Sequence, residues 1–129
     1  MKIYAFATLA MIALSAAAAF TQSHPYTPEK GSAERKAILD AVRKYRKAPD
    51  EVYTPTAFKV LKGWAYVAAA DPNDPGVDSE AFEFVLRKSG NVWKVIDEIS
   101  HIEGSNPEKE KMRIRRKFPE LPAAIFSIH

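Results

Sequence analysis

Asp97 and His101 are the side chains that come closest to acid–base chemistry in this sequence. Both lie in an alternating apolar run, where a carboxylate beside Trp93 and Val95 would lose part of its hydration. Loss of hydration raises the pKa of a carboxyl group, as a general base at neutral pH requires. In a regular strand the two residues point to the same face but stand about 13 Å apart, too far for a hydrogen bond. The other interpretation is structural, with Asp97 binding water or a backbone amide and His101 closing the strand.

Four aromatic side chains are candidates for a ligand pocket. Three fall in predicted strands and one in a predicted helix, namely Trp64, Tyr66, Trp93 and Tyr45. A half-open sheet next to a helix would present such rings to a small ligand. The same rings are also the expected filling of a protein core.

A run of cations near the C-terminus is the candidate for an electrostatic interface. Its members include Arg113, Arg115, Arg116 and Lys117. Such a run attracts anionic lipid headgroups, polysaccharide or an acidic protein, or it is simply a solvated helix face that keeps the chain soluble. We do not expect nucleic acid as a partner, because no aromatic stacking motif accompanies the run.

Metal and cofactor motifs are missing from the sequence. Asp71, Asn73 and Gly76 match part of a calcium loop, but Pro75 and Phe82 occupy positions that must supply ligands. Weak calcium binding would use Asp71, Asp74, Asp78 and Glu80, and the alternative is a solvated turn. The histidines are scattered and there is no cysteine for a zinc site. We predict no metal site and no cofactor.

Residues 1–19 have the layout of a cleavable secretory signal. Lys2 supplies the positive start, residues 3–14 form an uncharged apolar run, and residues 17–19 fit the A-x-A cleavage rule. The run is shorter than the roughly 20 apolar residues of a membrane-spanning helix. A lipid anchor would need a cysteine, and the chain has none. We predict cleavage after Ala19, a periplasmic or secreted protein, and no transmembrane anchor.

Hydrophobic periodicity predicts the elements that position these residues. Residues 20–30 predict an irregular leader, and residues 31–129 predict a single domain. A helix starts near Ser32 and ends before Pro49. Its apolar positions recur at i, i+3, i+4 and i+7, and they are Ile38, Ala41, Val42 and Tyr45.

Strand-like alternation follows the helix. The predicted strands are 56–61, 64–70, 81–88 and 92–101. Lys62-Gly63 and Ser89-Gly90-Asn91 predict tight connections between neighbouring strands. In the last strand Trp93, Val95 and Ile99 should share one face. A short charged helix over 108–118 and an apolar tail over 123–126 end the chain.

The predicted fold class is α+β, with one N-terminal helix packed on a four-stranded antiparallel meander and a short C-terminal helix. The helix covers one apolar face of the sheet, in a cystatin-like or minimal NTF2-like arrangement. Without cysteines the domain has to be held together by a well-packed core.

Several blocks of this chain, in this order, resemble a family of small exported bacterial proteins of uncharacterised function. The blocks are 34–43, 58–60 with 63–67, 84–88 with 93–95, and 122–126. The resemblance spans roughly residues 31–126 and implies a periplasmic location and an NTF2-like or cystatin-like fold. It implies no agreed activity. The segment before Phe118 departs from the family pattern because it is richer in lysine and arginine.

Two function classes follow from these observations. The first is a non-enzymatic binding module that holds a protein partner or a small ligand in the concavity between helix and sheet. The alternative is a small NTF2-like enzyme that uses Asp97 or His101 as acid–base in an aromatic pocket. A homodimer through the open face of the sheet is a third, structural interpretation.

Overall fold

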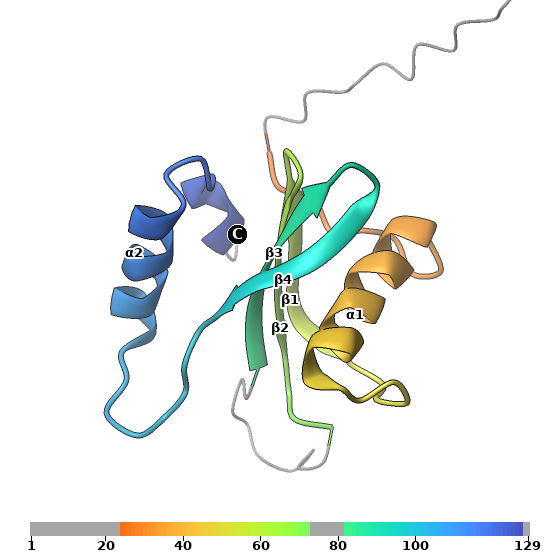
Figure 1. Cartoon of the computed structure of the whole chain (residues 1–129), viewed down its shortest axis with the longest axis horizontal. Coiled ribbons are helices and arrows are strands. Elements are labelled where there is room, and N and C mark those ends of the chain that lie inside the picture. The colour runs from red at the N-terminus through yellow and green to blue at the C-terminus, as the bar shows by residue number, and fades with distance from the viewer. Residues whose placement is uncertain (1–23, 73–81, 128–129) are drawn as a thin grey trace, which may run out of the picture.

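The fold is α+β, with one four-stranded antiparallel sheet between two helices (Figure 1). The computed structural model describes residues 24–72 and 82–127. The elements, in chain order, are α1 (Ala33–Arg46), β1 (Pro55–Leu61), β2 (Trp64–Ala69), β3 (Phe82–Ser89), β4 (Val92–Glu98), α2 (Pro107–Lys117) and the 3-10 helix η1 (Ala123–Phe126). The predicted fold class is confirmed. None of the helices described is long and apolar enough to cross a membrane.

Helix α1 begins and ends where its sequence predicts. The Ser32 hydroxyl accepts a hydrogen bond from the backbone N–H of Arg35 at 3.1 Å and so caps the first turn. Lys47 closes the last turn in the left-handed conformation, with φ 56°. The apolar stripe is buried at Ile38 and Val42, whereas Tyr45 remains 47% exposed.

The sheet is a meander in the order β1-β2-β3-β4. The β1–β2 hairpin turns at Lys62 and Gly63, both with positive φ (49° and 79°), as a two-residue turn that matches the strand twist requires. The β3–β4 hairpin turns at Gly90 and Asn91. β4 ends at Glu98, earlier than predicted.

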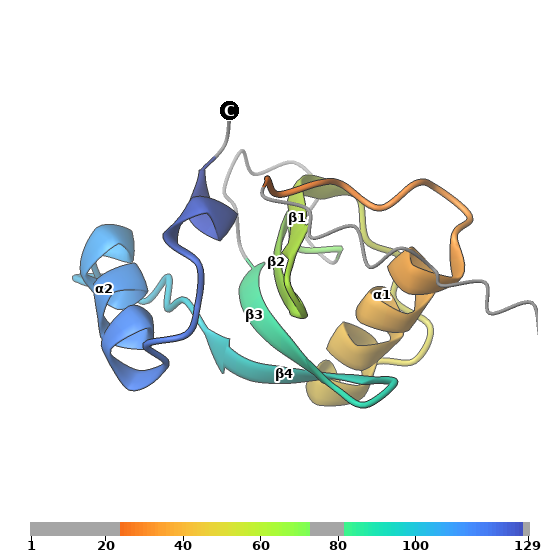
Figure 2. The same cartoon turned by 90° about the horizontal axis from the view of Figure 1, so that it is seen from above.

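Both faces of the sheet are covered (Figure 2). α1 covers one face, where its buried residues pack with Phe58, Val67 and Phe84. The other face packs against Ile114 of α2 and Ile125 of η1. Since every residue of β2 is buried, the prediction of one covered and one open face is wrong, and a dimer through an open face has no surface to use.

A β-bulge in β4 reverses the alternation of its side chains. Odd-numbered residues before the bulge point to one face of the sheet, and odd-numbered residues after it point to the other. Val85 lies opposite Asp97, whereas the next residue, Leu86, lies opposite Val95, so Ile96 is the extra residue. Trp93 and Val95 consequently face α1, while Asp97 and Ile99 face α2. The predictions that Ile99 shares a face with Trp93 and that Asp97 lies beside it are wrong.

The segment before α1 adds to the free edge of β1. Tyr26 exchanges two backbone hydrogen bonds with Val60, at 3.0 and 2.8 Å. The Thr27 hydroxyl donates to the carbonyl of Phe58 at 2.7 Å. The described part of the predicted leader is therefore paired with the sheet.

Candidate functional site

His101 is held by a buried carboxylate that the sequence did not reveal. Its Nε2 lies 2.7 Å from Oε2 of Glu83, whose side chain is only 3% exposed. The Tyr66 hydroxyl donates to the other oxygen of the same carboxylate. Glu83 lies opposite Ala68 on the α2 side of the sheet. From the alternation of side chains along β3, Glu83 is expected on the open face of the sheet. It is buried because α2 and η1 cover that face.

This cluster orients an imidazole by a carboxylate, which is the arrangement that fixes the tautomer of an acid–base histidine. The His101 side chain is partly exposed. However, His101 and Glu83 line neither the groove between α1 and β4 nor the groove beside the α1–β1 connection.

Asp97 has a separate, structural set of partners. Its two carboxylate oxygens each lie 3.1 Å from the Arg113 guanidinium, which also binds Glu110. Hydrogen bonds to Asp97, and then to Glu110, raise the pKa of Arg113 above its usual value. Lys117 lies 4.0 Å from the same aspartate. Asp97 thus ties α2 to β4, and the structure does not bring it together with His101.

The four candidate aromatics are divided between the two faces of the sheet. Trp64 stacks edge-on with Phe118, and Tyr66 with the other aromatic of that side, Phe126. Trp93 lies in the core under α1. The four rings therefore do not line one pocket, but Tyr45 and Trp93 do share a groove.

That groove, of about 550 Å³, runs between α1 and β4. We call it the α1–β4 groove. Its lining includes Ala37, Asp40, Ala41, Lys44, Tyr45, Asn91, Val92, Trp93, Lys94 and Val95. The Tyr45 ring packs edge-on against Phe84, with 5.7 Å between the ring centroids. Partial burial, and then the charges of Glu98 and Asp97, raise the pKa of Tyr45.

In the part of the chain that the structure describes, two of the cations that line the α1–β4 groove have no acidic partner. Asp40 is neutralised by Lys36 and Arg43, at 2.5 and 2.8 Å. Lys44 and Lys94 are both exposed, and within the described ranges neither has a carboxylate within 4.0 Å. The groove therefore combines two aromatic rings with two unneutralised cations.

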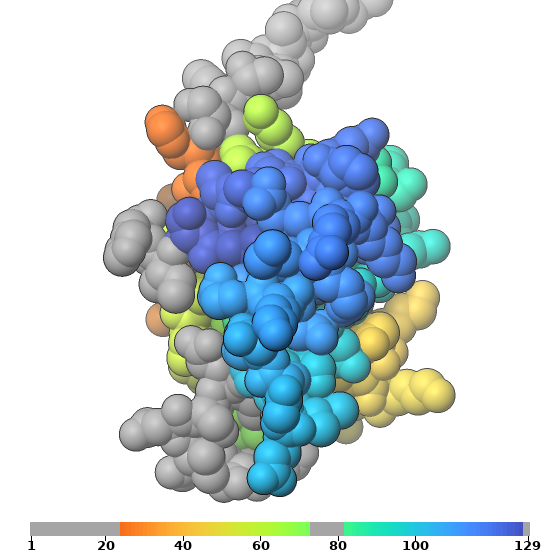
Figure 3. Space-filling model, turned by 90° about the vertical axis from the view of Figure 1, so that its left-hand side faces the viewer, coloured from red at the N-terminus to blue at the C-terminus, as the bar shows by residue number. Residues whose placement is uncertain are grey.

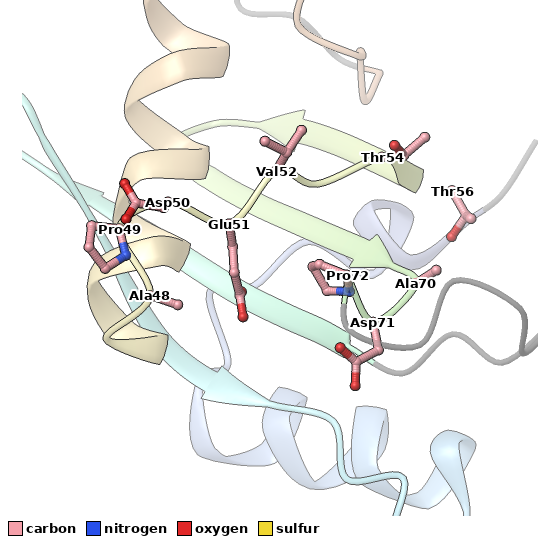
Figure 4. A pocket seen from close by; sticks show the side chains of 10 residues that line it. All are labelled: Ala48, Pro49, Asp50, Glu51, Val52, Thr54, Thr56, Ala70, Asp71 and Pro72. Atoms are coloured by element: carbon pink, nitrogen blue, oxygen red, sulfur yellow. The ribbon is translucent and has the colours of Figure 1, made fainter.

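A second groove, of about 800 Å³, lies where the α1–β1 connection meets the end of β2 (Figure 4). Its acidic side chains are Asp50, Glu51 and Asp71. Glu51 is already paired with Arg46, at 2.8 and 2.9 Å. Of the weak calcium ligands considered above, Asp74, Asp78 and Glu80 lie outside the described residues. The residues described include no group of three side chains able to hold a metal ion.

Comparisons with protein-family models, with curated proteins and with solved structures give no match to this chain. The resemblance to a family of exported proteins therefore stays a prediction. The function has to be inferred from the surfaces of this chain alone.

Proposed function

We propose that this protein is an exported, non-enzymatic binding module that holds an extended peptide segment of a partner in the α1–β4 groove. The observation that supports this proposal is a groove lined by Tyr45 and Trp93 next to the unpaired edge of the sheet. It is the concavity between helix and sheet in which the sequence predicts a bound partner.

The edge of β4 favours an extended peptide over other occupants. The two-residue turn makes Ser89 and Val92 a hydrogen-bonded pair. Alternation along an antiparallel ladder then turns the backbone groups of Trp93 and Val95 away from β3. In 24–72 and 82–127 no segment pairs with them. A strand added there would satisfy these groups and direct its side chains toward Tyr45.

The charge of the groove specifies the partner further. Lys44 and Lys94 flank the path of such a strand, so an acidic segment binds more favourably than a basic one. A second copy of the chain would bring Lys94 of both copies to the same edge. For this reason we propose an acidic peptide and not a homodimer.

Site-specific photo-crosslinking in the cells that make the protein tests this function. A photoreactive residue at Val92, which is 56% exposed in the groove, should give a discrete protein adduct. The adduct should disappear in a Lys44→Glu/Lys94→Glu variant and persist in an Arg115→Glu/Arg116→Glu variant. An identical adduct from Val52, at the second groove, would contradict the proposal. If no protein adduct forms and native mass spectra show a retained small molecule, the ligand of the groove is a small molecule and not a peptide.

Export is part of the same proposal. The signal-like pattern of residues 1–19 supports it. Protein recovered from the periplasm or medium of an expressing bacterium should begin at Phe20 by mass spectrometry. Full-length protein in the cytoplasmic fraction would contradict it.

A second candidate function, acid–base catalysis, is favoured by the contact between His101 and Glu83. In this alternative Glu83 replaces Asp97 as the partner of the histidine. Hydrolysis of an activated ester should then be lost in His101→Ala and weakened in Glu83→Gln. Equal rates in wild type and His101→Ala would exclude this role.

A further inference from the structure

The cations of α2 divide into an inward and an outward set. Arg113 and Lys117 turn toward Asp97. Lys111 lies over the rings of Tyr66 and Phe126. The outward set is exposed and consists of Lys109, Arg115 and Arg116. Among the residues described, no carboxylate lies within 4.0 Å of any of these three. Of the basic run seen in the sequence, Lys109, Arg115 and Arg116 are therefore the members that remain available to a partner.

An exposed apolar side chain lies among these cations, one turn after the exposed Glu108. Met112 is 57% exposed. Lys109 precedes it by three residues, and Arg115 and Arg116 follow it by three and four residues. Residues at these spacings are neighbours on a helix surface. Ile102, in the connection that precedes α2, is 77% exposed. Figure 3 shows that α2 and this connection form one continuous side of the molecule.

We propose that the outward face of α2 docks on the surface of an anionic phospholipid bilayer. Long cationic side chains around an apolar one match an anionic headgroup layer with hydrocarbon beneath it. The face is the outer side of a helix, and the α1–β4 groove and the groove beside the α1–β1 connection lie on other parts of the surface. A planar headgroup layer suits that shape better than an acidic peptide, which would need a groove. The docking face lies across the sheet from α1 (Figure 2), so it does not depend on the α1–β4 groove.

Co-sedimentation with phospholipid vesicles tests this docking. The protein is used as exported by an expressing bacterium, with its N-terminus checked by mass spectrometry. We expect it to sediment with phosphatidylglycerol vesicles, to stay in solution with phosphatidylcholine vesicles, and to be released by salt. Each Lys or Arg near an anionic surface strengthens binding about fivefold, so Arg115→Glu/Arg116→Glu should weaken it by at least about 25-fold. Met112→Ser should also weaken vesicle binding relative to the wild type, and the binding that remains should still depend on salt.

The matched control reverses two cations that lie outside α2, one on α1 and one on the edge strand β4. Lys44→Glu/Lys94→Glu changes the net charge by the same amount and should retain at least most of the binding. Equal losses in the two double variants would reduce the effect to net charge and overturn the proposal, as would equal binding to both lipids. Binding of soluble polyglutamate that depends on Arg115 and Arg116, without binding to phosphatidylglycerol, would assign the face to an acidic polypeptide instead. Urea unfolding of each variant confirms that it is folded.

Discussion

At the scale of the residue, the hydrogen bonds of the buried Glu83 carboxylate are the contacts that we expect to be most sensitive to substitution. A buried carboxylate is stable only when its oxygens are hydrogen-bonded. Tyr66 and His101 bind one oxygen each. Changes at any of the three residues should therefore affect the other two.

Tyr66→Phe leaves one oxygen of Glu83 without its donor in a dry environment. We expect the free energy of unfolding to fall by about 1–3 kcal/mol, measured by urea titration. Tyr45→Phe, which removes a hydroxyl from a half-exposed ring, serves as the control and should stay within about 0.5 kcal/mol. Equal effects of the two substitutions would mean that the Glu83 contact has no energetic weight.

Glu51 makes stability depend on pH in the acid range. Its hydrogen bonds with Arg46, and further with Tyr53, lower its pKa from 4.5 to about 2, although burial opposes this. A lowered carboxyl pKa stabilises the fold above pH 4.5, and the contribution disappears as the pH falls toward 2. Because solvent screens part of this interaction, we expect ionised Glu51 to add about 1–2 kcal/mol to the free energy of unfolding.

Glu51→Gln tests this contribution. Its unfolding free energy should lie below that of the wild type at pH 6, and the gap should close between about pH 4.5 and 2. Asp50→Asn, at an exposed neighbour, is the control for the loss of one carboxylate charge. A gap that is constant with pH would assign the loss to packing.

At the scale of the element, α2 depends on the ion pairs at its inner side. Ile114 is the one fully buried side chain of this helix, so its docking has a single apolar anchor, to which the ion pairs add. The Asn106 side chain caps its first turn. The pairing of Arg113 with Asp97 supplies the remaining attachment to β4.

Asp97→Asn should loosen α2 selectively. We expect hydrogen exchange of its amides to accelerate about tenfold while the amides of β2 change far less. Lys117→Gln, which removes only the 4.0 Å contact with the same aspartate, is the matched control and should have a smaller effect. A uniform acceleration in both elements would indicate global destabilisation.

Elements with strong local signals could be predicted from the sequence. Helix α1 has a capping serine and an apolar stripe, and both hairpins have a turn glycine. The helix that covers the second face gives no such local signal, since it contributes one buried residue, Ile114. The bulge at Ile96 has no local sequence signature, and it is the bulge that separates Asp97 from Trp93. A signal was present in β2, where apolar residues at every position are typical of a strand buried on both faces.

At the scale of the whole molecule, the two proposed interfaces lie on opposite sides of one sheet. The α1–β4 groove faces one way and the outer side of α2 the other (Figure 2). Reversing the charges of one interface should therefore leave binding at the other interface intact. This independence makes each double variant the control for the other.

The pairing of Tyr26 with Val60 limits how large an assembly this protein can build. Because Tyr26 covers the middle of the β1 border, growth by strand addition is directed to the β4 border and stops after a single addition. Removal of residues before Gly31 would leave two free borders, and we expect open-ended polymers that scatter light. A chain beginning at Phe20 should remain of defined size in the same measurement. The predicted cleavage site precedes Tyr26, so cleavage there would preserve the residue whose pairing blocks strand addition at β1.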